Sequence, residues 1–151
     1  MTRSEAWALL TEFTQSDSLR KHALAVEAAM RHYAGLLGAD VELWGVTGLL
    51  HDFDYERWPE PPEHTRAGAK ILRERGVDDE IVEAILSHAE WNQDDHPLDR
   101  PMRRALFAVD ELAGFILAVA YVRPDRLAGV TPSSVKTKLK QKSFAAAVKR
   151  Q

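Results

Sequence analysis

Apolar side chains recur every three to four positions along most of the chain, the spacing that places residues on one face of an α-helix. The strict alternation of a half-buried strand is absent, and so are internal repeats. The stripes predict six helices and a final lysine-rich segment, at about residues 4–13, 17–37, 41–51, 63–75, 79–91, 101–122 and 131–150. We therefore predict an all-α protein, folded as a bundle of helices.

Residues that favour helix ends stand at the edges of these stripes. The side chains that can cap N-termini are Ser16 or Asp17, Asp40 and Asp78, and the glycines that can end helices are Gly38 and Gly76. The helix after Asp40 is apolar nearly all round, which predicts that it is buried at the centre. Three prolines between residues 53 and 64 predict a long loop directly after His51 and Asp52.

Five predicted helices each direct one histidine or aspartate toward the core. These residues are His22, His51, His64, His88 and Asp110, and Asp52 follows at the end of the third helix. A histidine on an apolar face is often a satisfied core residue, but burying an unpaired carboxylate costs several kcal/mol. A divalent cation offsets that cost, and imidazole with carboxylate suits such ions. We therefore expect these inward residues to surround a divalent metal.

The other two histidines lie away from these stripes. His32 is about 80° round the second helix from His22, and His96 precedes Pro97 in a polar loop. We expect both at the surface, whereas Tyr33 shares the stripe of His22 and is expected to point inward.

Length and composition indicate one domain, residues 1–151, with a core at about 17–122 and a basic tail at about 131–150. The chain has no cysteine, which excludes disulfides, thiolate metal sites and cysteine nucleophiles. Its first 15 residues lack the apolar run of a signal peptide, and no apolar stretch approaches the roughly 20 residues that span a bilayer. We expect a cytoplasmic protein that has no contact with membranes.

Charge is unevenly distributed along the chain. The net charge is −3, but residues 1–125 hold 13 basic and 23 acidic residues, and the seven charged residues from Arg126 onward are all basic. A basic tail on an acidic body could contact a phosphorylated ligand or nucleic acid, although a solvated helix face is an equally ordinary explanation.

The polar residues on the apolar faces resemble those of the HD-domain metal-dependent phosphohydrolase superfamily. Its signature is a histidine, a later His-Asp pair and a distant aspartate, matched here by His22 in LRKHALAVE, His51-Asp52 in GLLHDFDYE and Asp110 in FAVDELAGF. The resemblance covers about residues 17–122, and the tail SVKTKLKQKSFAAAV is similar to that of one small HDIG-like subgroup. It implies an HD-domain-like orthogonal helical bundle, a metal at the helix junction bound by His22, His51, Asp52 and Asp110, and, most often, hydrolysis of phosphate esters.

The resemblance also implies a second metal position. Dinuclear members place two further histidines between the HD pair and the last aspartate, and His64 and His88 occur there, 24 residues apart. By this similarity Asp52 bridges two ions, and the cofactor is one or two divalent ions of Mn, Zn, Ni, Mg or Fe. The alternative places His64 and His88 around a single metal, as substrate contacts or supporting residues.

One feature departs from the superfamily. Members that act on nucleotides or guanosine tetraphosphate carry acidic residues as HDxxE or HDxxED, whereas this chain reads HDFDYE, with Asp54 and Glu56 displaced. Those particular activities are therefore in doubt. We expect Asp52 and Asp54 to be the catalytic residues, Asp54 as an acid/base or water-orienting group. The alternative for Asp54 is a surface loop carboxylate.

The expected function is hydrolysis of a small phosphorylated metabolite or nucleotide by water that the metal activates. Cations that could hold the phosphate are Lys21, next to Arg20 and His22, and Lys136, Lys138 and Lys142 in the tail. The alternatives are a di-iron HD-type oxygenase, a non-catalytic HD signalling module and, last, a nucleic-acid-binding module. We expect no nucleic-acid partner and leave open a homodimer.

Overall fold

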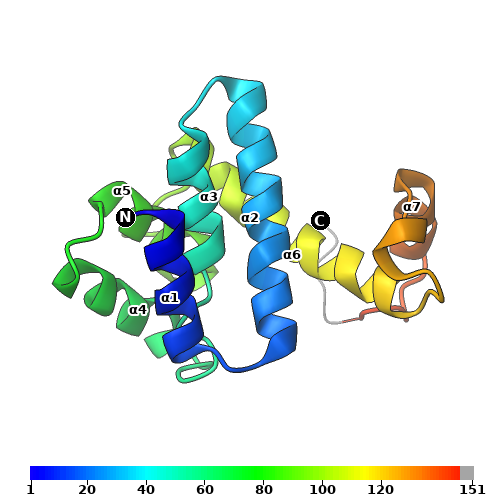
Figure 1. The fold of residues 1–151 in the computed structure, drawn as a ribbon, viewed down its shortest axis with the longest axis horizontal. Coiled ribbons are helices and arrows are strands. Elements are labelled where there is room, and N and C mark those ends of the chain that lie inside the picture. The colour runs from blue at the N-terminus through cyan, green and yellow to red at the C-terminus, as the bar shows by residue number, and fades with distance from the viewer. Residues whose placement is uncertain (147–151) are drawn as a thin grey trace. The chain divides into compact units, whose positions relative to one another are not determined.

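The computed structural model describes residues 1–146, which form helices, turns and loops with no strand among them. The elements in chain order are α1 (Arg3–Phe13), α2 (Asp17–Leu37), α3 (Val41–Leu50), α4 (Glu63–Glu74), α5 (Asp79–His88), the 3₁₀-helix η1 (Glu90–Asn92), α6 (Pro101–Tyr121), the 3₁₀-helix η2 (Arg126–Gly129) and α7 (Pro132–Leu139). Figure 1 labels the α-helices among them. The prediction of an all-α fold is confirmed.

Two compact units make up the chain, Met1–Val109 and Asp110–Gln151. The division falls within α6, so the first unit contains α1 to α5, η1 and the beginning of α6. None of the helices in the described residues has both the length and the apolar character that a membrane span requires.

The predicted caps form as expected in the first unit. Ser16 accepts the Leu19 amide at the start of α2, and the helix ends at Gly38, whose φ of 66° is left-handed. The Asp40 carboxylate accepts the amides of Glu42 and Leu43 at the start of α3.

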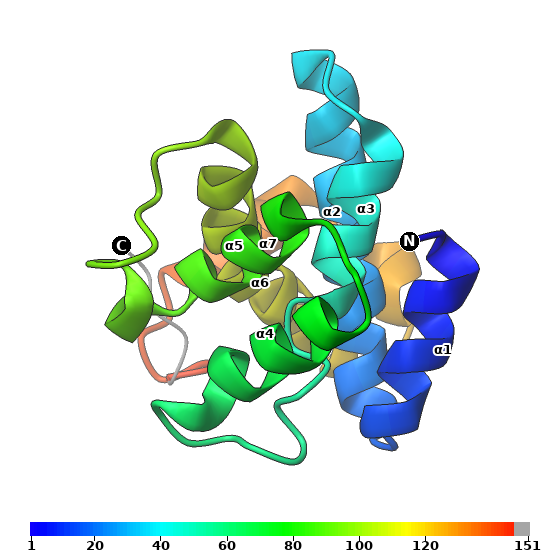
Figure 2. The ribbon, with the colours of Figure 1, turned by 90° about the vertical axis from the view of Figure 1, so that its left-hand side faces the viewer.

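Helix α3 is the centre of the first unit. It contacts α1, α2 and α5, and its residues from Trp44 to Leu50 are all buried. Figure 2 is viewed from the side of α4 and α5, and it shows these two helices side by side. The main core combines residues from five helices and two loops, among them Leu9, Leu10, Ala23, Leu49, Leu50, Phe53, Leu72, Val77, Ile81 and Ile85. The prediction of a buried third helix is confirmed.

Three corrections concern single segments. Helix α4 is interrupted near its start, where His64 and Thr65 have non-helical backbone angles, because Asp54 binds the backbone there. Helix α5 ends at His88 rather than near Trp91, because Ala89 is extended. Tyr33 is 43% exposed, not inward, because the buried face of α2 passes through Met30 and Ala34 and Tyr33 lies to one side of it.

A charged cluster around the buried Glu27 joins α1, α2 and α3. Glu27 on α2 is buried, and its carboxylate accepts two hydrogen bonds from Arg3, at 2.7 and 2.9 Å, and one from Arg31 at 2.9 Å. Arg31 also pairs with Glu42 at 2.6 Å. A Cβ on Gly45 would lie 2.5 Å from the Arg31 guanidinium, so a larger residue there would displace the Arg31 side chain from the cluster. The cluster thus compensates the buried charge of Glu27.

The second unit has its own small core. Phe115 and Val119 of α6 pack with Val135 of α7, and Phe144 packs against this cluster. Thr131 caps α7 by accepting the Ser134 amide, so the predicted start of the lysine-rich helix is confirmed. The helix ends at Leu139, and the last two basic residues of the predicted tail, Lys149 and Arg150, lie outside the described residues.

Replacing Glu27 with glutamine tests the charged cluster. The variant keeps the shape of the side chain but removes the anion, so Arg3 and Arg31 lose a charged acceptor. We expect the free energy of unfolding in urea to fall by about 1–3 kcal/mol. The matched control is Glu42→Gln, which removes an exposed partner of Arg31 and should leave the urea midpoint nearly unchanged. Equal losses in the two variants would contradict this account.

Candidate metal centre

Helix ends bring four histidines around one aspartate in the first unit. His22 lies in the second turn of α2, and His51 and Asp52 directly follow α3. His64 lies at the interrupted start of α4, and His88 is the last residue of α5. Because α3 packs against both α2 and α5, these elements meet near its C-terminal end.

One oxygen of Asp52 faces the first pair of histidines. Asp52 Oδ2 lies 3.4 Å from His51 Nε2 and 4.0 Å from His22 Nε2, and the two Nε2 atoms are 3.2 Å apart. These nitrogens and this oxygen are all metal-ligating atoms, and they converge closely enough to share one ion.

The other oxygen of Asp52 faces a second pair. Asp52 Oδ1 lies 3.2 Å from His64 Nε2 and 3.2 Å from His88 Nε2. The three residues form a second group whose ligand atoms lie within 4.8 Å of one another. Asp52 thus stands between two pairs of imidazoles, one pair at each carboxylate oxygen.

Hydrogen bonds on the far side of three rings decide which nitrogen faces Asp52. His51 Nδ1 lies 2.8 Å from the Gly48 carbonyl, and His88 Nδ1 lies 2.6 Å from the Ile85 carbonyl. A carbonyl only accepts, so each Nδ1 donates its hydrogen, and in the neutral ring Nε2 keeps a lone pair. These bonds hold the Nε2 lone pairs in the position of metal ligands.

Asp54 orients the His64 ring in the same way and also holds the backbone next to it. Its Oδ1 accepts from His64 Nδ1 at 3.1 Å, and its Oδ2 accepts the amides of Thr65 and Gly68, both at 2.9 Å. The approach is so close that a Cβ on Gly68 would lie 2.9 Å from the carboxylate. Asp54 is 1% exposed, so the alternative of a surface loop carboxylate is wrong.

The carboxylates and imidazoles of this group stabilise one another's charged forms. Burial by itself would raise the pKa of the Asp52 carboxyl, but the imidazole of His51, followed by those of His64 and His88, holds that pKa well below its usual range. Burial would lower the pKa of His64, but the nearby carboxylates of Asp52 and Asp54 raise it to about 9. Without metal, the His64 ring is therefore protonated on both nitrogens at neutral pH, and a metal that binds Nε2 must displace the proton there.

The donor set fits divalent metal. Asp52 Oδ1 is shut off from solvent and accepts no well-aligned hydrogen bond from residues 1–146, although two imidazole nitrogens lie 3.2 Å away. Atoms that bind the same metal ion lie close together without pointing hydrogens at one another, and these nitrogens and this oxygen show that arrangement. Imidazole and carboxylate together suit zinc, manganese, nickel or iron.

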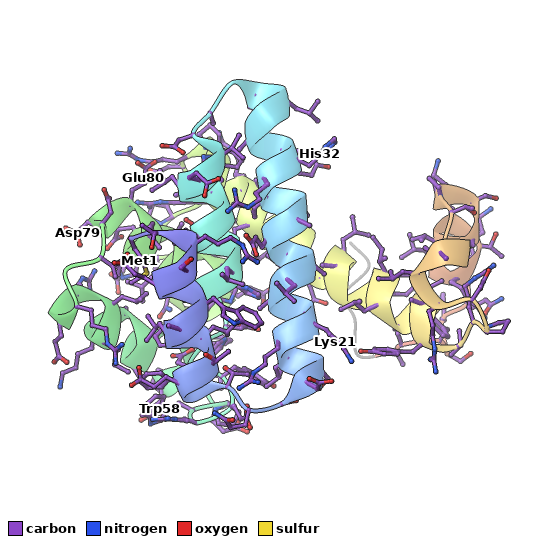
Figure 3. All side chains as sticks on the ribbon, in the orientation of Figure 1. Met1, Lys21, His32, Trp58, Asp79 and Glu80 are labelled. Atoms are coloured by element: carbon purple, nitrogen blue, oxygen red, sulfur yellow. The ribbon has the colours of Figure 1, made fainter. Side chains whose placement is uncertain are left out.

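The remaining predicted residues are placed as follows. Lys21 is exposed on α2 and its Nζ lies 3.0 Å from Asp17; Figure 3 shows Lys21 and His32 on the side of α2 that faces away from α1. His32 is exposed, as predicted, but His96 is half-buried and its Nδ1 lies 2.7 Å from Glu83.

Four predicted residues belong to the second unit: Asp110, Lys136, Lys138 and Lys142. Asp110 lies on α6, Lys136 and Lys138 lie on α7, and Lys142 follows that helix. Their parts in metal or phosphate binding stay predictions.

Sequence patterns missed several residues beside His64. The rings of Tyr55 and Trp91 lie 5.1 and 5.9 Å from the His64 ring, and Arg66 bonds to the buried Asn92. Tyr55 and Trp91 belong to no apolar stripe, and nothing in the sequence pairs Arg66 with a residue 26 positions away. Only the nearness of Arg66 to His64 in the chain could have drawn attention to it.

Substituting both His64 and His88 by alanine tests the second metal position. We expect the bound metal to fall to half, because the group around Asp52 Oδ1 would lose both nitrogen ligands. Metal content is measured by mass spectrometry on the purified protein, with His32→Ala as the control for an exposed histidine. An unchanged metal content in the double variant would return both residues to a substrate-binding or supporting role.

Asp54→Asn tests the positioning of His64. The amide oxygen can still accept the backbone amides, but the anion beside Nδ1 is lost, so the protonated form of His64 is less stabilised. We expect the pKa of His64 in the metal-free protein to fall from about 9 toward its ordinary range, measured by NMR titration. The control is Asp94→Asn in an exposed turn, which should leave that pKa unchanged. A His64 pKa that stays near 9 in Asp54→Asn would contradict the role of Asp54.

Comparison with known families agrees with this geometry. The sequence model of the HD domain matches residues 19–113, more than half of the chain. The matched segment contains all six predicted ligands, which are His22, His51, Asp52, His64, His88 and Asp110. No solved structure matches the chain. The pattern of ligands and the family match lead to one conclusion: this chain belongs to the HD-domain family.

Proposed function

We propose that this protein is a divalent-metal-dependent phosphohydrolase that acts on a small phosphorylated metabolite or nucleotide. The observation that carries the proposal is the position of Asp52, whose Oδ2 faces His51 and His22 and whose Oδ1 faces His64 and His88. A carboxylate with imidazoles at both oxygens can serve two neighbouring divalent ions. The HD family, whose members are generally metal-dependent hydrolases, supports the same reaction class.

We further propose how the ligands are shared. His22, His51 and Asp52 hold the first ion together with Asp110, and Asp52, His64 and His88 hold the second. A bound divalent ion supplies positive charge that polarises the phosphate and lowers the pKa of water.

The protein's own residues prepare this site before substrate arrives. His51 and His88 are held by backbone carbonyls and His64 by Asp54, so three rings need little reorganisation. All three rings are buried, which keeps competing water away from their nitrogens. Asp54 thus acts in this proposal as a positioning residue, and its predicted acid/base role is not required.

Lysines remain candidates for binding phosphate. Lys21 pairs with Asp17 at 3.0 Å, but both side chains are exposed, so water competes with the pair and a phosphate could replace Asp17. The tail lysines Lys136, Lys138 and Lys142 are proposed for the same task on the basis of charge alone.

Metal-dependent phosphate release tests the proposal. Protein purified without added metal is analysed for metal content and then screened against phosphorylated metabolites with Mn²⁺ and Ni²⁺ under anaerobic conditions. We expect phosphate release that EDTA abolishes. Asp52→Asn should lower kcat/KM by roughly 10³-fold, because it removes the carboxylate that both histidine pairs face. The matched control, Asp79→Asn, changes an exposed residue at the start of α5 that Figure 3 labels, and should leave the rate unchanged.

Two outcomes would contradict the proposal. Activity that requires iron and oxygen would indicate the di-iron oxygenase instead. Absence of turnover by a metal-loaded protein across the whole screen would favour a non-catalytic HD module.

A further inference from the structure

Arg66 is a cation held at a defined place beside the candidate metal centre. It lies two residues after His64, and its Nε donates to the Asn92 side-chain oxygen at 2.9 Å. Some arginines of the first unit pair with glutamates, as Arg3, Arg31, Arg73 and Arg75 do, and others, such as Arg57 and Arg104, donate to backbone carbonyls. Within residues 1–146, no carboxylate forms an ion pair with Arg66. Its guanidinium therefore remains available for an anion that the protein itself does not provide.

Asn92 gives Arg66 a rigid support. It is 1% exposed, and its nitrogen donates to the Thr65 hydroxyl at 2.8 Å and to the Leu86 carbonyl at 3.2 Å. With Arg66 on its oxygen, the Asn92 amide is bonded at both ends. Such a network keeps the stem of a long side chain in place and lowers the entropy lost on binding.

The backbone between His64 and Arg66 is strained. Thr65 has a φ of 68°, which a β-branched residue rarely adopts. Asp54 holds its amide and Asn92 its hydroxyl, so the surrounding structure imposes this conformation. The result is that His64 faces Asp52 while Arg66 reaches Asn92.

Two partly exposed aromatic rings contact the His64 ring. Tyr55 and Trp91 lie 5.1 and 5.9 Å from the His64 ring, yet they remain 39% and 43% exposed. Trp91 adjoins Asn92 in η1, so the rings and the Arg66 support belong to one neighbourhood. Exposed aromatic faces beside a cation suit a ligand that joins a planar ring to an anion.

We propose that Arg66, Tyr55 and Trp91 form the substrate-recognition surface of this site, with Arg66 binding a phosphate and the two rings stacking on a planar aromatic group attached to it. The inference rests on the proposed phosphohydrolase function and names the class of substrate: a phosphate ester that carries a planar ring.

Binding of two matched probes tests this surface. The probes are the phosphonate analogues of adenosine monophosphate and of ribose 5-phosphate, in which CH₂ replaces the ester oxygen and blocks hydrolysis. Calorimetry on Mn²⁺-loaded protein gives both dissociation constants. We expect the adenosine probe to bind at least about 10-fold more tightly, because only it offers a ring for stacking.

Four variants separate the parts of the surface. Arg66→Gln should weaken both probes by about 10-fold, whereas Trp91→Leu should weaken only the adenosine probe and bring the two affinities within about twofold. The controls are Lys70→Gln, an exposed cation on the same helix, and Tyr33→Leu, an aromatic ring of matching exposure on α2. Both should bind as the unchanged protein does.

The inference is overturned if the unchanged protein does not prefer the adenosine probe, or if Arg66→Gln and Lys70→Gln bind alike. The hydrolysis assay on Asp52→Asn distinguishes this failure from failure of the proposed function. Loss of hydrolysis in that variant with no effect of Arg66 or Trp91 would leave the phosphohydrolase and remove the recognition surface. The expected binding pattern without any turnover would support the recognition surface and contradict the phosphohydrolase function.

Discussion

The Asp52 carboxylate lies between imidazoles at both of its oxygens, and this arrangement constrains how the helices of the first unit pack. The Asp52 side chain is only 19% exposed, and a carboxylate so largely removed from water costs several kcal/mol without compensating charge, so protonated histidine or metal must lie beside it. The compensating groups come from α2, the end of α3, the start of α4 and the end of α5. Those elements must therefore meet at one point, and the apolar packing around α3 brings them there.

The hydrogen bonds at the ends of α3 and α5 satisfy free carbonyls and also orient two histidine rings. The last carbonyls of a helix lack intrahelical partners and require donors. His51 and His88 each donate Nδ1–H to a carbonyl three residues earlier, Gly48 and Ile85. The same bond that satisfies the carbonyl turns Nε2 toward Asp52. Helix termination and ligand orientation thus depend on the same hydrogen bond.

Polar residues in the core divide into two kinds by how their bonds are used. Glu27 is fully engaged by Arg3 and Arg31 and serves to join helices. Around His64, by contrast, the bonds of Asp54 and Asn92 stabilise a strained backbone at Thr65 and leave one guanidinium available. Strain that neighbouring groups must impose is characteristic of binding sites rather than of cores.

Much of this protein could be predicted from local patterns. Helical periodicity, the caps at Ser16 and Asp40, and the inward positions of His22, His51 and His88 all follow from the sequence, because they depend on residues within a few turns. His64 also faces inward, but it lies in a non-helical segment that Asp54 holds. The partners of Asp54 and the bond from Arg66 to Asn92 could not be predicted, because they join residues 10 to 26 positions apart across a loop. Local periodicity determines which face of a helix is buried, whereas only the packing of helices decides which polar groups meet there.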